Sequence, residues 1–480
     1  MNLRLFGKNA LIYAVGTICL RLAAFLLIPV YTRSLSVSDY GLLAALLITI
    51  QVMATVMDLG MRKGFLRFAA EYQEHHRTGE LLGSSTFIII AGGVLVAGSS
   101  LLLLLPFFRG VFHTEEAATL VMLACGAALS QALYHHITSF YRARNLGLRY
   151  MVASLAALLL LIASNLVALF ILRLGVRGAL FAQIITYGGL WLLVSASVFR
   201  QTGLDISTAL TKKLFVFGFP LVFALSGDLI TDSSAIYLLS YFADLEHVAI
   251  YSLGQKMAMI ASMVLILPFQ LAYEPFLYAH IDQPGIQSTI ARLFTYLMLA
   301  FAFVALAIAF AARDLLAVIA TADYASAYLV IFLLLPGVAF RGVYNIGESL
   351  LHIKNKTQVT GITVTLATLL SVGLNYVLIS QWGMYGAMLV FNVTMISTAV
   401  LIMALGIKAF PIRLETARLG VVAVLFVAFM AATYLLRNTN AYLFYGVVPV
   451  IGIGSLFLLC ATGFLHDHER AAIRGLLYRT

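Results

Sequence analysis

The sequence predicts an all-α integral membrane protein with fourteen transmembrane helices. Of the 480 residues, 62% are hydrophobic and only 10% are charged, against about 25% charged residues in a typical soluble domain. Apolar runs of about 20 residues, the length that crosses the hydrocarbon core as a helix, recur from near the N-terminus almost to the end. No stretch is long and polar enough to form a separate soluble domain.

The fourteen apolar runs define the expected helices in order. The first run continues past Arg21 to Val30 without a small-residue cleavage site, so we expect a retained helix rather than a signal peptide. After the second run, the segment from Arg62 to Glu80 mixes charges with apolar residues and predicts an amphipathic helix on the cytoplasmic surface. The expected helices are 9–31, 41–61, 82–107, 117–139, 150–172, 178–199, 215–238, 249–272, 293–312, 325–347, 359–380, 384–406, 418–436 and 441–464.

Positive charge sets the expected orientation. Fourteen crossings place both termini on one side of the membrane, and most of the 30 Lys and Arg residues fall on that side. Because cytoplasmic loops carry the excess of Lys and Arg, both termini are predicted to be cytoplasmic. The cations behind the net charge of +10 lie mostly in these cytoplasmic loops, where the orientation of the helices explains them. The positive charge therefore does not indicate a nucleic-acid partner.

Catalytic and metal-binding patterns are not found in the sequence. The three Cys residues all fall in apolar runs and are interpreted as packing residues. His135 and His136 are adjacent, and neighbouring side chains on a helix point in different directions, which argues against a metal site. Neither a phosphate-binding glycine loop nor a nucleophile elbow lies at a usable position. We therefore expect a protein that is not an enzyme and binds no metal.

Weak internal similarity divides the chain. The turn at 35–41 between the first two helices has a counterpart at 243–249 between the seventh and eighth helices. Because six helices separate the two, the halves would share one orientation about an axis along the membrane normal. This predicts two pseudo-symmetric six-helix lobes, 1–206 and 207–410, followed by two further helices and a cytoplasmic tail in 411–480.

Charges inside the apolar runs are the main functional candidates. A charged side chain at the centre of the bilayer costs at least about 2.5 kcal/mol, so each one is a functional hypothesis. Five such residues occur: Arg21, Asp228, Asp232, Lys256 and Arg341. Two pairings follow from their depth. Asp232 and Lys256 lie at similar depth in the membrane on neighbouring helices and could form a purely structural ion pair. Arg21 and Asp228 also match in depth and could pair across a central cleft.

Helix 325–347 carries a polar stripe. Arg341 and Glu348 are seven residues apart and therefore share one helix face, with Asn345 between them. Such a stripe is expected to face an aqueous cavity. Asp58 and Glu348 lie near cytoplasmic helix ends, where a merely interfacial role is equally open.

Residues 28–41 read IPVYTRSLSVSDYG, and this segment resembles the opening motif of bacterial polysaccharide repeat-unit flippases of the Wzx type. These proteins belong to the multidrug, oligosaccharidyl-lipid and polysaccharide (MOP) exporter superfamily. Relatives often have Gly immediately before the Ile-Tyr-Ser step at 250–252, whereas this chain has Ala249. The resemblance covers the first twelve helices only. Further matching residues are Asp58, Leu59, Gly60, Arg67, Phe68, Ile250, Tyr251, Ser252, Lys256, Pro268, Phe269, Pro275, Phe276, Asn375, Trp382, Gly383, Gly386 and Ala387.

The resemblance implies a fold, a cargo and a location. The fold would be a V-shaped bundle like that of multidrug exporters, working by alternating access in the bacterial cytoplasmic (inner) membrane. The cargo would be an undecaprenyl-pyrophosphate-linked oligosaccharide turned from the cytoplasmic to the periplasmic leaflet for lipopolysaccharide or exopolysaccharide synthesis. Membrane lipid, a polysaccharide polymerase and chain-length machinery would be its partners.

A pyrophosphate needs cations in the cavity, and sugars need hydrogen-bonding groups. We therefore assign substrate binding to Arg21, Lys256, Arg341 and Asn345, and gating or ion coupling to Asp58, Asp228, Asp232 and Glu348. No cofactor is expected, and coupling to H⁺ or Na⁺ stays open. Three alternatives are a cation-coupled exporter of drugs or other amphiphiles, a lipid II flippase, and an integral-membrane glycosyltransferase or polymerase, for which the external loops are short.

Overall fold

The computed structural model describes residues 25–74, 77–225, 227–354, 356–436, 445–452 and 454–455. These residues are helical almost throughout, and none of them lies in a β-strand. Within them, 11 helices are long and apolar enough to cross a membrane. The chain is therefore a multi-pass membrane protein, as its composition predicts.

The predicted helices can be compared with these spans one by one. The first and last, 9–31 and 441–464, lie mostly outside the described residues, and the seventh is described as two helices on either side of residue 226. Each of the other predicted helices overlaps one of the 11 spans. The all-helical membrane fold is thus confirmed, while the number fourteen stays a prediction.

The chain divides into two compact units that do not follow one cut in the sequence. Unit 1 contains the described residues of Met1–Leu253, Ala317–Tyr324 and Thr368–Val390. Unit 2 contains those of Gly254–Leu316, Ala325–Ala367 and Phe391–Thr480. The lobe boundaries predicted at 206 and 410 remain predictions.

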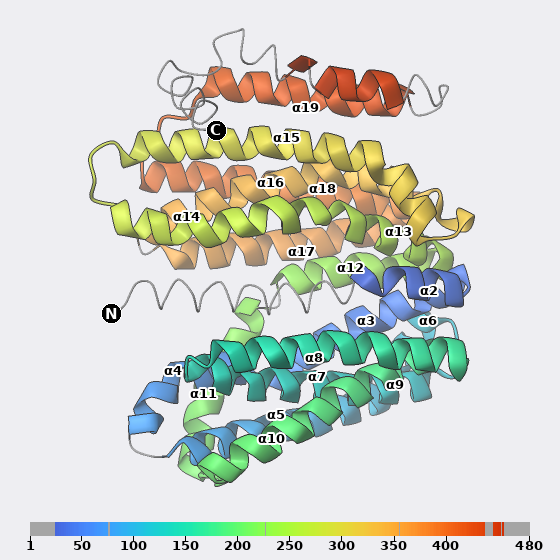
Figure 1. Cartoon of the computed structure of the whole chain (residues 1–480), viewed down its shortest axis with the longest axis vertical. Helices are drawn as coiled ribbons and strands as arrows, with labels where there is room; N and C mark the ends of the chain where they lie inside the picture. The colour runs from blue at the N-terminus through green and yellow to red at the C-terminus, as the bar shows by residue number, and fades with distance from the viewer. Residues whose placement is uncertain are drawn as a thin grey trace, which may run out of the picture. The chain divides into compact units, whose positions relative to one another are not determined.

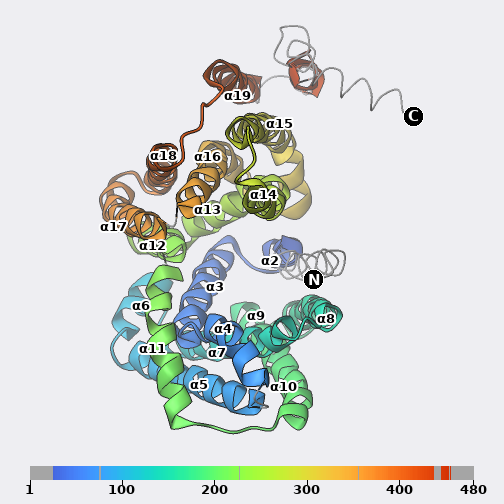
Figure 2. The ribbon, with the colours of Figure 1, turned by 90° about the vertical axis from the view of Figure 1, so that its left-hand side faces the viewer.

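Unit 1 is built around α7 (Ala117–Ala143), which packs against α3, α5 and η2 (Figure 2). Its small residues Ala124, Ala127 and Ala128 are almost fully buried and let the neighbouring backbones approach closely. The other elements that this unit takes from the chain before Gly254 are α2 (Ile28–Ser34), α3 (Val37–Asp58), α4 (Met61–Glu74), α5 (Thr78–Leu102), α6 (Leu105–Phe112), α8 (Gly147–Leu166), η1 (Val167–Ile171), α9 (Gly175–Gln183), η2 (Ile184–Gly188), α10 (Gly189–Thr202), α11 (Thr208–Leu225), α12 (Gly227–Phe242) and the start of α13 (Leu245–Ala258).

Helix α4 has the predicted amphipathic character but ends earlier than residue 80. Met61, Phe65 and Ala69, spaced four residues apart, are buried on one face, whereas Arg62 and Lys63 are exposed. The α3–α4 junction turns sharply at Leu59, with φ of 45°, and at Gly60, with φ of 71°. Helix α4 is thereby redirected from the axis of α3.

The two turns that look alike in sequence are built alike. The Ser36 hydroxyl accepts the backbone N–H of Asp39 at 3.1 Å at the start of α3. At the start of α13, the Asp244 carboxylate accepts the backbone N–H of His247 at 2.8 Å. Both side chains satisfy a helix N-terminus from the same relative position.

The same end of unit 1 is held by three further contacts. The Thr32 hydroxyl donates to the Ile319 carbonyl at 2.7 Å. The Arg33 guanidinium donates to the Val318 carbonyl at 2.6 Å. The Tyr40 ring packs edge-on against Tyr324, which lies in the 3₁₀ turn η4 (Ala322–Tyr324). Residues from both predicted halves thus meet within one unit.

Unit 2 contains a long helical run that lies beside α16 (Ala327–Ile353). The run is α13, the π-helical segment η3 (Ser262–Ile266) and α14 (Leu267–His280) (Figure 1). A Cβ on Gly254 would lie 2.4 Å from Val330 Cβ, and further along the Tyr273 hydroxyl lies 3.2 Å from Ser349 Oγ. The two helices therefore run parallel. The remaining helices are α15 (Ile286–Ile319), α17 (Thr357–Trp382), α18 (Met384–Ala409) and α19 (Thr416–Leu436), and parts of α15, α17 and α18 belong to unit 1.

Candidate functional site

The candidate site lies on the polar face of α16 in unit 2. Arg341, Asn345 and Glu348 are half-buried and follow one another along that face, as their spacing predicts. Pro336 lies inside the same helix one and a half turns earlier. There the Asn392 side chain of α18 accepts the Gly337 N–H and donates to the Leu333 carbonyl, both at 2.8 Å. Asn392 therefore fixes the helix where its own hydrogen bonding is interrupted.

Helix α14 completes the polar face with residues that sequence reasoning did not select. The Asn345 amide donates to Gln270 Oε1 at 3.3 Å, and the Gln270 amide donates to Glu274 Oε1 at 2.9 Å. Glu274 and Gln270 are one turn apart, so a continuous hydrogen-bonded chain joins α14 to α16. Glu274 lies beyond the end of the predicted helix 249–272. Gln270 lies inside it but is an amide, and no nearby charged residue within the predicted helix marks its position.

Glu348 extends this polar face by one further turn. Its Oε1 accepts the Tyr344 hydroxyl at 3.1 Å and lies 4.0 Å from His352 Nε2. The His352 contact becomes an ion pair only when the imidazole is protonated. Since the Glu348 side chain retains 24% exposure, the carboxylate is held by neighbours yet remains accessible. A carboxylate in this position can accept further hydrogen bonds.

Lys256 belongs to the same unit but lies at another depth. It is half-buried on α13, two residues after Gly254, where this helix contacts the start of α16. Gln270 lies further along the same helical run, about 20 Å away at ~1.5 Å per residue. The structure therefore places Arg341 and Asn345 close together and sets Lys256 apart from them.

The other predicted residues belong to unit 1 or lie outside the described part of the chain. Asp58 is 4% exposed at the end of α3, with its Oδ1 3.4 Å from Arg62 Nε. Asp232 is half-buried on α12. Asp228 lies on the same helix, but its side chain is outside the described part, and so is the whole of Arg21. The predicted pairs of Arg21 with Asp228 and of Asp232 with Lys256 stay predictions.

Helix α12 is joined to α17 by buried polar side chains near Asp232. The Asn375 amide donates to Ser234 Oγ at 3.0 Å, and the Thr368 hydroxyl donates to the Gly227 carbonyl at 3.3 Å. Asn375 is 2% exposed, and its Oδ1 accepts no hydrogen bond from the described residues. Among those residues, no cluster of His, Cys, Asp and Glu could hold a metal ion.

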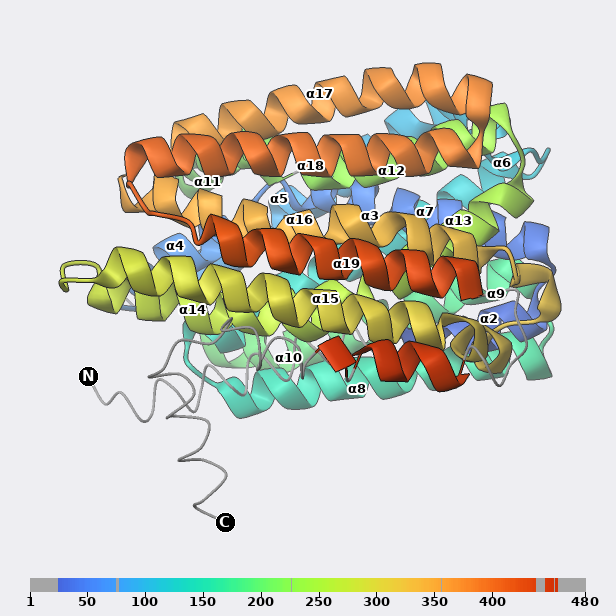
Figure 3. The same ribbon diagram turned by 90° about the horizontal axis from the view of Figure 1, so that it is seen from above.

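An apolar cavity of about 630 Å³ lies between α15, α16, α18 and α19 of unit 2. These helices can be followed in Figure 3. Phe294, Phe340, Met403 and Phe426 are among the side chains that line it, one from each helix. Such a lining offers contact to hydrocarbon and no hydrogen bonds to a sugar. The predicted last two helices thus include one, α19, that encloses a hydrophobic space.

Comparison with solved structures identifies the fold. The chain matches the lipid II flippase MurJ in an inward closed conformation with a TM-score of 0.75 and 12% identity, over 95% of this chain and 99% of that one. It matches an inward-facing multidrug resistance transporter of the MATE family, MOP superfamily, with a TM-score of 0.63 and 15% identity, over 83% and 94%. It also matches a variant of the Vibrio cholerae MATE transporter VcmN with a TM-score of 0.57 and 16% identity, over 85% of this chain and 97% of that one.

Sequence comparison identifies the family. No curated protein sequence matches the chain. The family model described as polysaccharide biosynthesis protein matches residues 6–278, which is more than half of the chain. This match contains the opening motif at 28–41, the acidic end of α3 and Lys256. The chain belongs to the polysaccharide biosynthesis protein family and has the fold of MOP-superfamily transporters.

Proposed function

We propose that the protein flips an undecaprenyl-pyrophosphate-linked oligosaccharide from the cytoplasmic to the periplasmic leaflet by alternating access. The hydrogen-bonded chain of Asn345, Gln270 and Glu274, with Arg341 one turn before Asn345 on α16, supports this proposal. Polar and charged groups at membrane depth are expensive, and they are kept where they line a pathway for a polar cargo. Membership of the polysaccharide biosynthesis protein family supports a cargo that contains sugar.

Each part of such a cargo has a suitable partner in the chain. Arginine binds phosphate oxygens in a bidentate manner, which suits Arg21 and Arg341 to the pyrophosphate, with Lys256 as a further cation along the path. The amides of Asn345 and Gln270 suit sugar hydroxyls, which both donate and accept hydrogen bonds. The carboxylates of the same face accept bonds from those hydroxyls and balance the cations.

The apolar cavity suits the lipid part of the cargo. Its volume of about 630 Å³ is that of a drug-sized ligand and would accept several isoprene units. Burial of hydrocarbon contributes about 25 cal/mol per Å² of apolar surface. An amphiphilic cargo would therefore gain from polar contacts on α14 and α16 and from apolar contacts against α19.

Location and partners follow from the same proposal. The protein would lie in the bacterial inner membrane with both termini cytoplasmic, and its product would supply lipopolysaccharide or exopolysaccharide assembly. A polymerase and chain-length machinery would then use that product at the periplasmic face. Both expectations depend on the proposed cargo.

The decisive experiment identifies the lipid that depends on this protein. The gene is deleted, and the lipid-linked sugars of the cytoplasmic leaflet are identified by mass spectrometry. Accumulation of an undecaprenyl-pyrophosphate oligosaccharide supports the proposal, and its disappearance on complementation confirms the link. Accumulation of lipid II, or unchanged lipids with raised drug sensitivity, would replace the proposal by one of the two transport alternatives.

Arginine variants test the assigned pyrophosphate contacts. Arg21→Ala and Arg341→Ala are expected to lower surface polysaccharide about tenfold or more at unchanged protein level, since a charge-assisted hydrogen bond contributes roughly 1.5–3 kcal/mol. Arg200→Ala is the control, because Arg200 is exposed at the end of α10. Normal polymer in either test variant would remove that arginine from the site.

Ion coupling is assigned to Asp58, Asp228, Asp232 and Glu348. Purified protein in proteoliposomes is given an imposed pH, Na⁺ or electrical gradient, and flipping of a fluorescent lipid-linked sugar is measured. Stimulation by one gradient names the coupling ion. Indifference to all three would leave downhill flipping and withdraw the coupling role from these acids.

A further inference from the structure

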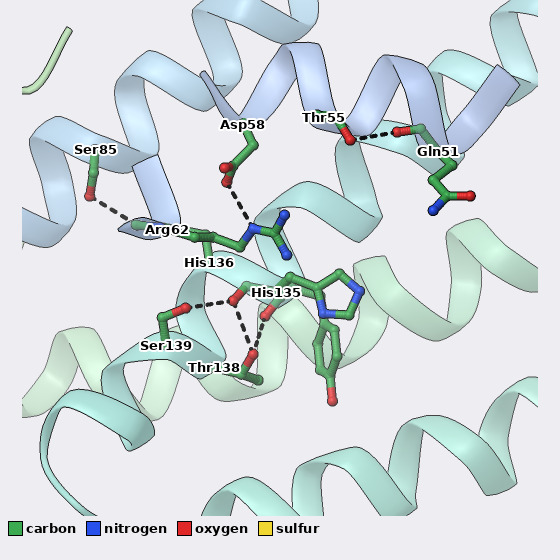
Figure 4. A network of polar contacts seen from close by, with 10 residues as sticks. Gln51, Thr55, Asp58, Arg62, Ser85, His135, His136, Thr138 and Ser139 are labelled. Carbon is green, nitrogen blue, oxygen red and sulfur yellow. Dashed lines mark hydrogen bonds and ion pairs between the residues drawn. The ribbon is translucent and has the colours of Figure 1, made fainter. Parts of the chain in front are cut away.

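A second polar cluster lies in the interior of unit 1, and the proposed cargo path does not use it. Asp58 ends α3, Arg62 lies in the first turn of α4, and His135 and His136 lie on α7 (Figure 4). Figure 4 shows the Arg62 side chain between Asp58 and the two histidines. Asp58 is 4% exposed and His136 is fully buried.

The hydrogen bonds of this cluster are incomplete. Asp58 Oδ1 lies 3.4 Å from Arg62 Nε and accepts no hydrogen bond from the described residues. The Ser85 hydroxyl donates to the Leu81 carbonyl at 2.6 Å, so its oxygen accepts from His136 Nε2 at 2.9 Å. This assigns the proton of the neutral ring to Nε2 and leaves the buried Nδ1 with a lone pair that no described donor satisfies.

Arg62 is the cation that acts on the whole cluster. Its charge acts on Asp58, on His135 and on His136. Of the elements packed here, α4 brings Arg62, α7 brings both histidines, and η2 brings Tyr187, whose ring lies 5.9 Å from that of His135. Helix α5 brings Ser85 against His136, and α11 brings Gly218 against Leu59. Asp58 is the carboxylate that pairs with Arg62, so a proton there removes the anion of this pair.

The Asp58–Arg62 pair bridges a backbone junction that contacts another helix. Leu59 and Gly60, both with positive φ, connect α3 to α4 between the two charged residues. On α11, a Cβ on Gly218 would lie 2.2 Å from the Leu59 carbonyl oxygen, and a Cβ on Gly60 would lie 2.7 Å from the Gly218 oxygen. The backbones are in direct contact there. A change in the angle between α3 and α4 must therefore displace α11.

We propose that Asp58 is a proton-binding switch: its protonation releases Arg62 toward the neutral histidines, loosens the α3–α4 junction and shifts α11. Asp58 takes up one proton to become a carboxylic acid, and the charge of the cluster changes from zero to plus one. The unsatisfied Nδ1 of His136 offers the released guanidinium an acceptor. Only the use of this switch to drive cargo movement rests on the proposed function.

Proton binding is tested by infrared difference spectroscopy of the full chain in lipid nanodiscs across a pH titration. A carboxyl band is expected to appear on acidification and to be absent from Asp58→Asn, while Asp205→Asn, at an exposed carboxylate, retains it. Arg62→Gln should move the midpoint at least tenfold in proton concentration toward higher pH, because the compensating charge is lost, whereas Arg62→Lys should stay near wild type. An unchanged band in Asp58→Asn, or an unmoved midpoint in Arg62→Gln, would overturn the proposal.

Conformational coupling is tested at a single pH by hydrogen exchange of the peptide covering α11. Asp58→Asn imitates the protonated acid and Arg62→Gln breaks the same pair, so both should exchange faster in residues 208–225 than wild type, while Asp205→Asn should not. Equal exchange in all four proteins would refute the link to α11. Neither measurement uses a cargo, so failure of the switch and failure of the proposed flippase activity can be told apart.

Discussion

At the scale of single residues, Gly41 marks the closest approach between two helix starts. A Cβ at this position would lie 1.7 Å from the Leu245 carbonyl oxygen, closer than any side chain tolerates. The starts of α3 and α13 meet there, and they are the two turns that resemble each other in the sequence. Because glycine has no Cβ, the starts of α3 and α13 can pack in direct backbone contact at this end of unit 1.

Gly41→Ala is expected to destabilise the protein by about 1–3 kcal/mol through overpacking. The measurement is the midpoint of thermal unfolding in detergent. The matched control is Gly361→Ala on α17, where an added Cβ meets nothing within 4 Å and alanine favours the helix. Equal stability of the two variants would contradict the close contact between the starts of α3 and α13 that the structure shows.

Asp244 provides a pH-dependent contribution to stability outside the membrane spans. Hydrogen bonds from His247 hold the pKa of its carboxyl below the usual value, although partial burial alone would raise it. A depressed folded pKa stabilises the protein above about pH 3.9, the unfolded value. That stability is lost as pH falls through the folded pKa.

Asp244→Ala is expected to cost roughly 1 kcal/mol at neutral pH, the usual value of an N-cap. Asp244→Asn should keep the cap and lose the pH dependence, because an amide accepts the same N–H but does not titrate in this range. Unfolding midpoints between pH 3 and 7 separate the two effects. A loss of stability in Asp244→Asn equal to that in Asp244→Ala would assign the role to charge instead.

Residue chemistry was predictable only where it was unusual. Arg341 and Glu348 are predictable because charge in an apolar run is rare, and Asn345 is predictable because it lies between them on the same helix face. Gln270 is not, because it is an amide with no charged residue near it within the predicted helix 249–272. The sequence places His135 and His136 next to each other on a helix, but their contacts with Ser85 and Arg62 depend on tertiary packing that no local pattern reports.

At the scale of elements, hydropathy predicts where the helices lie but not where they begin and end. Helix α15 runs from Ile286 to Ile319, whereas its apolar part predicts only 293–312. The extra turns carry polar residues such as Arg292, which a hydropathy pattern reads as loop. The shape of α4 was predictable because Met61, Phe65 and Ala69 repeat at helical spacing. The sharp turn before it at Leu59 was not, since a non-glycine residue with positive φ leaves no sequence signature.

At the scale of the whole molecule, composition and charge distribution suffice to predict a multi-pass helical protein. The sequence does not predict that Ala317–Tyr324 and Thr368–Val390 belong to unit 1, because this grouping depends on contacts between residues hundreds of positions apart. A weak repeat suggests symmetric halves, whereas packing groups the ends of several later helices with the first ones.

A charge exchange tests the predicted pair of Asp232 and Lys256. The double variant Asp232→Lys with Lys256→Asp should fold and express as wild type, while each single change, which leaves two like charges, should lower stability by several kcal/mol at membrane depth. Yield of monodisperse protein and the unfolding midpoint are the measurements. A double variant no better than the single ones would show that the two charges serve separate sites.

The π-helical segment η3 sets the rotational phase of α14. A π-turn accommodates one residue more than an α-turn, and each residue advances a helix by about 100°. Deleting one residue from 262–266 would restore regular α-winding and leave Gln270 on the side of Asn345, because the π-turn already holds the extra residue. Inserting one further residue there would rotate α14 by about 100° and carry Gln270 away from Asn345. A one-residue insertion should therefore abolish polysaccharide export in a protein that still reaches the membrane, whereas the one-residue deletion should not. The alignment of the polar face thus depends on how many residues precede it.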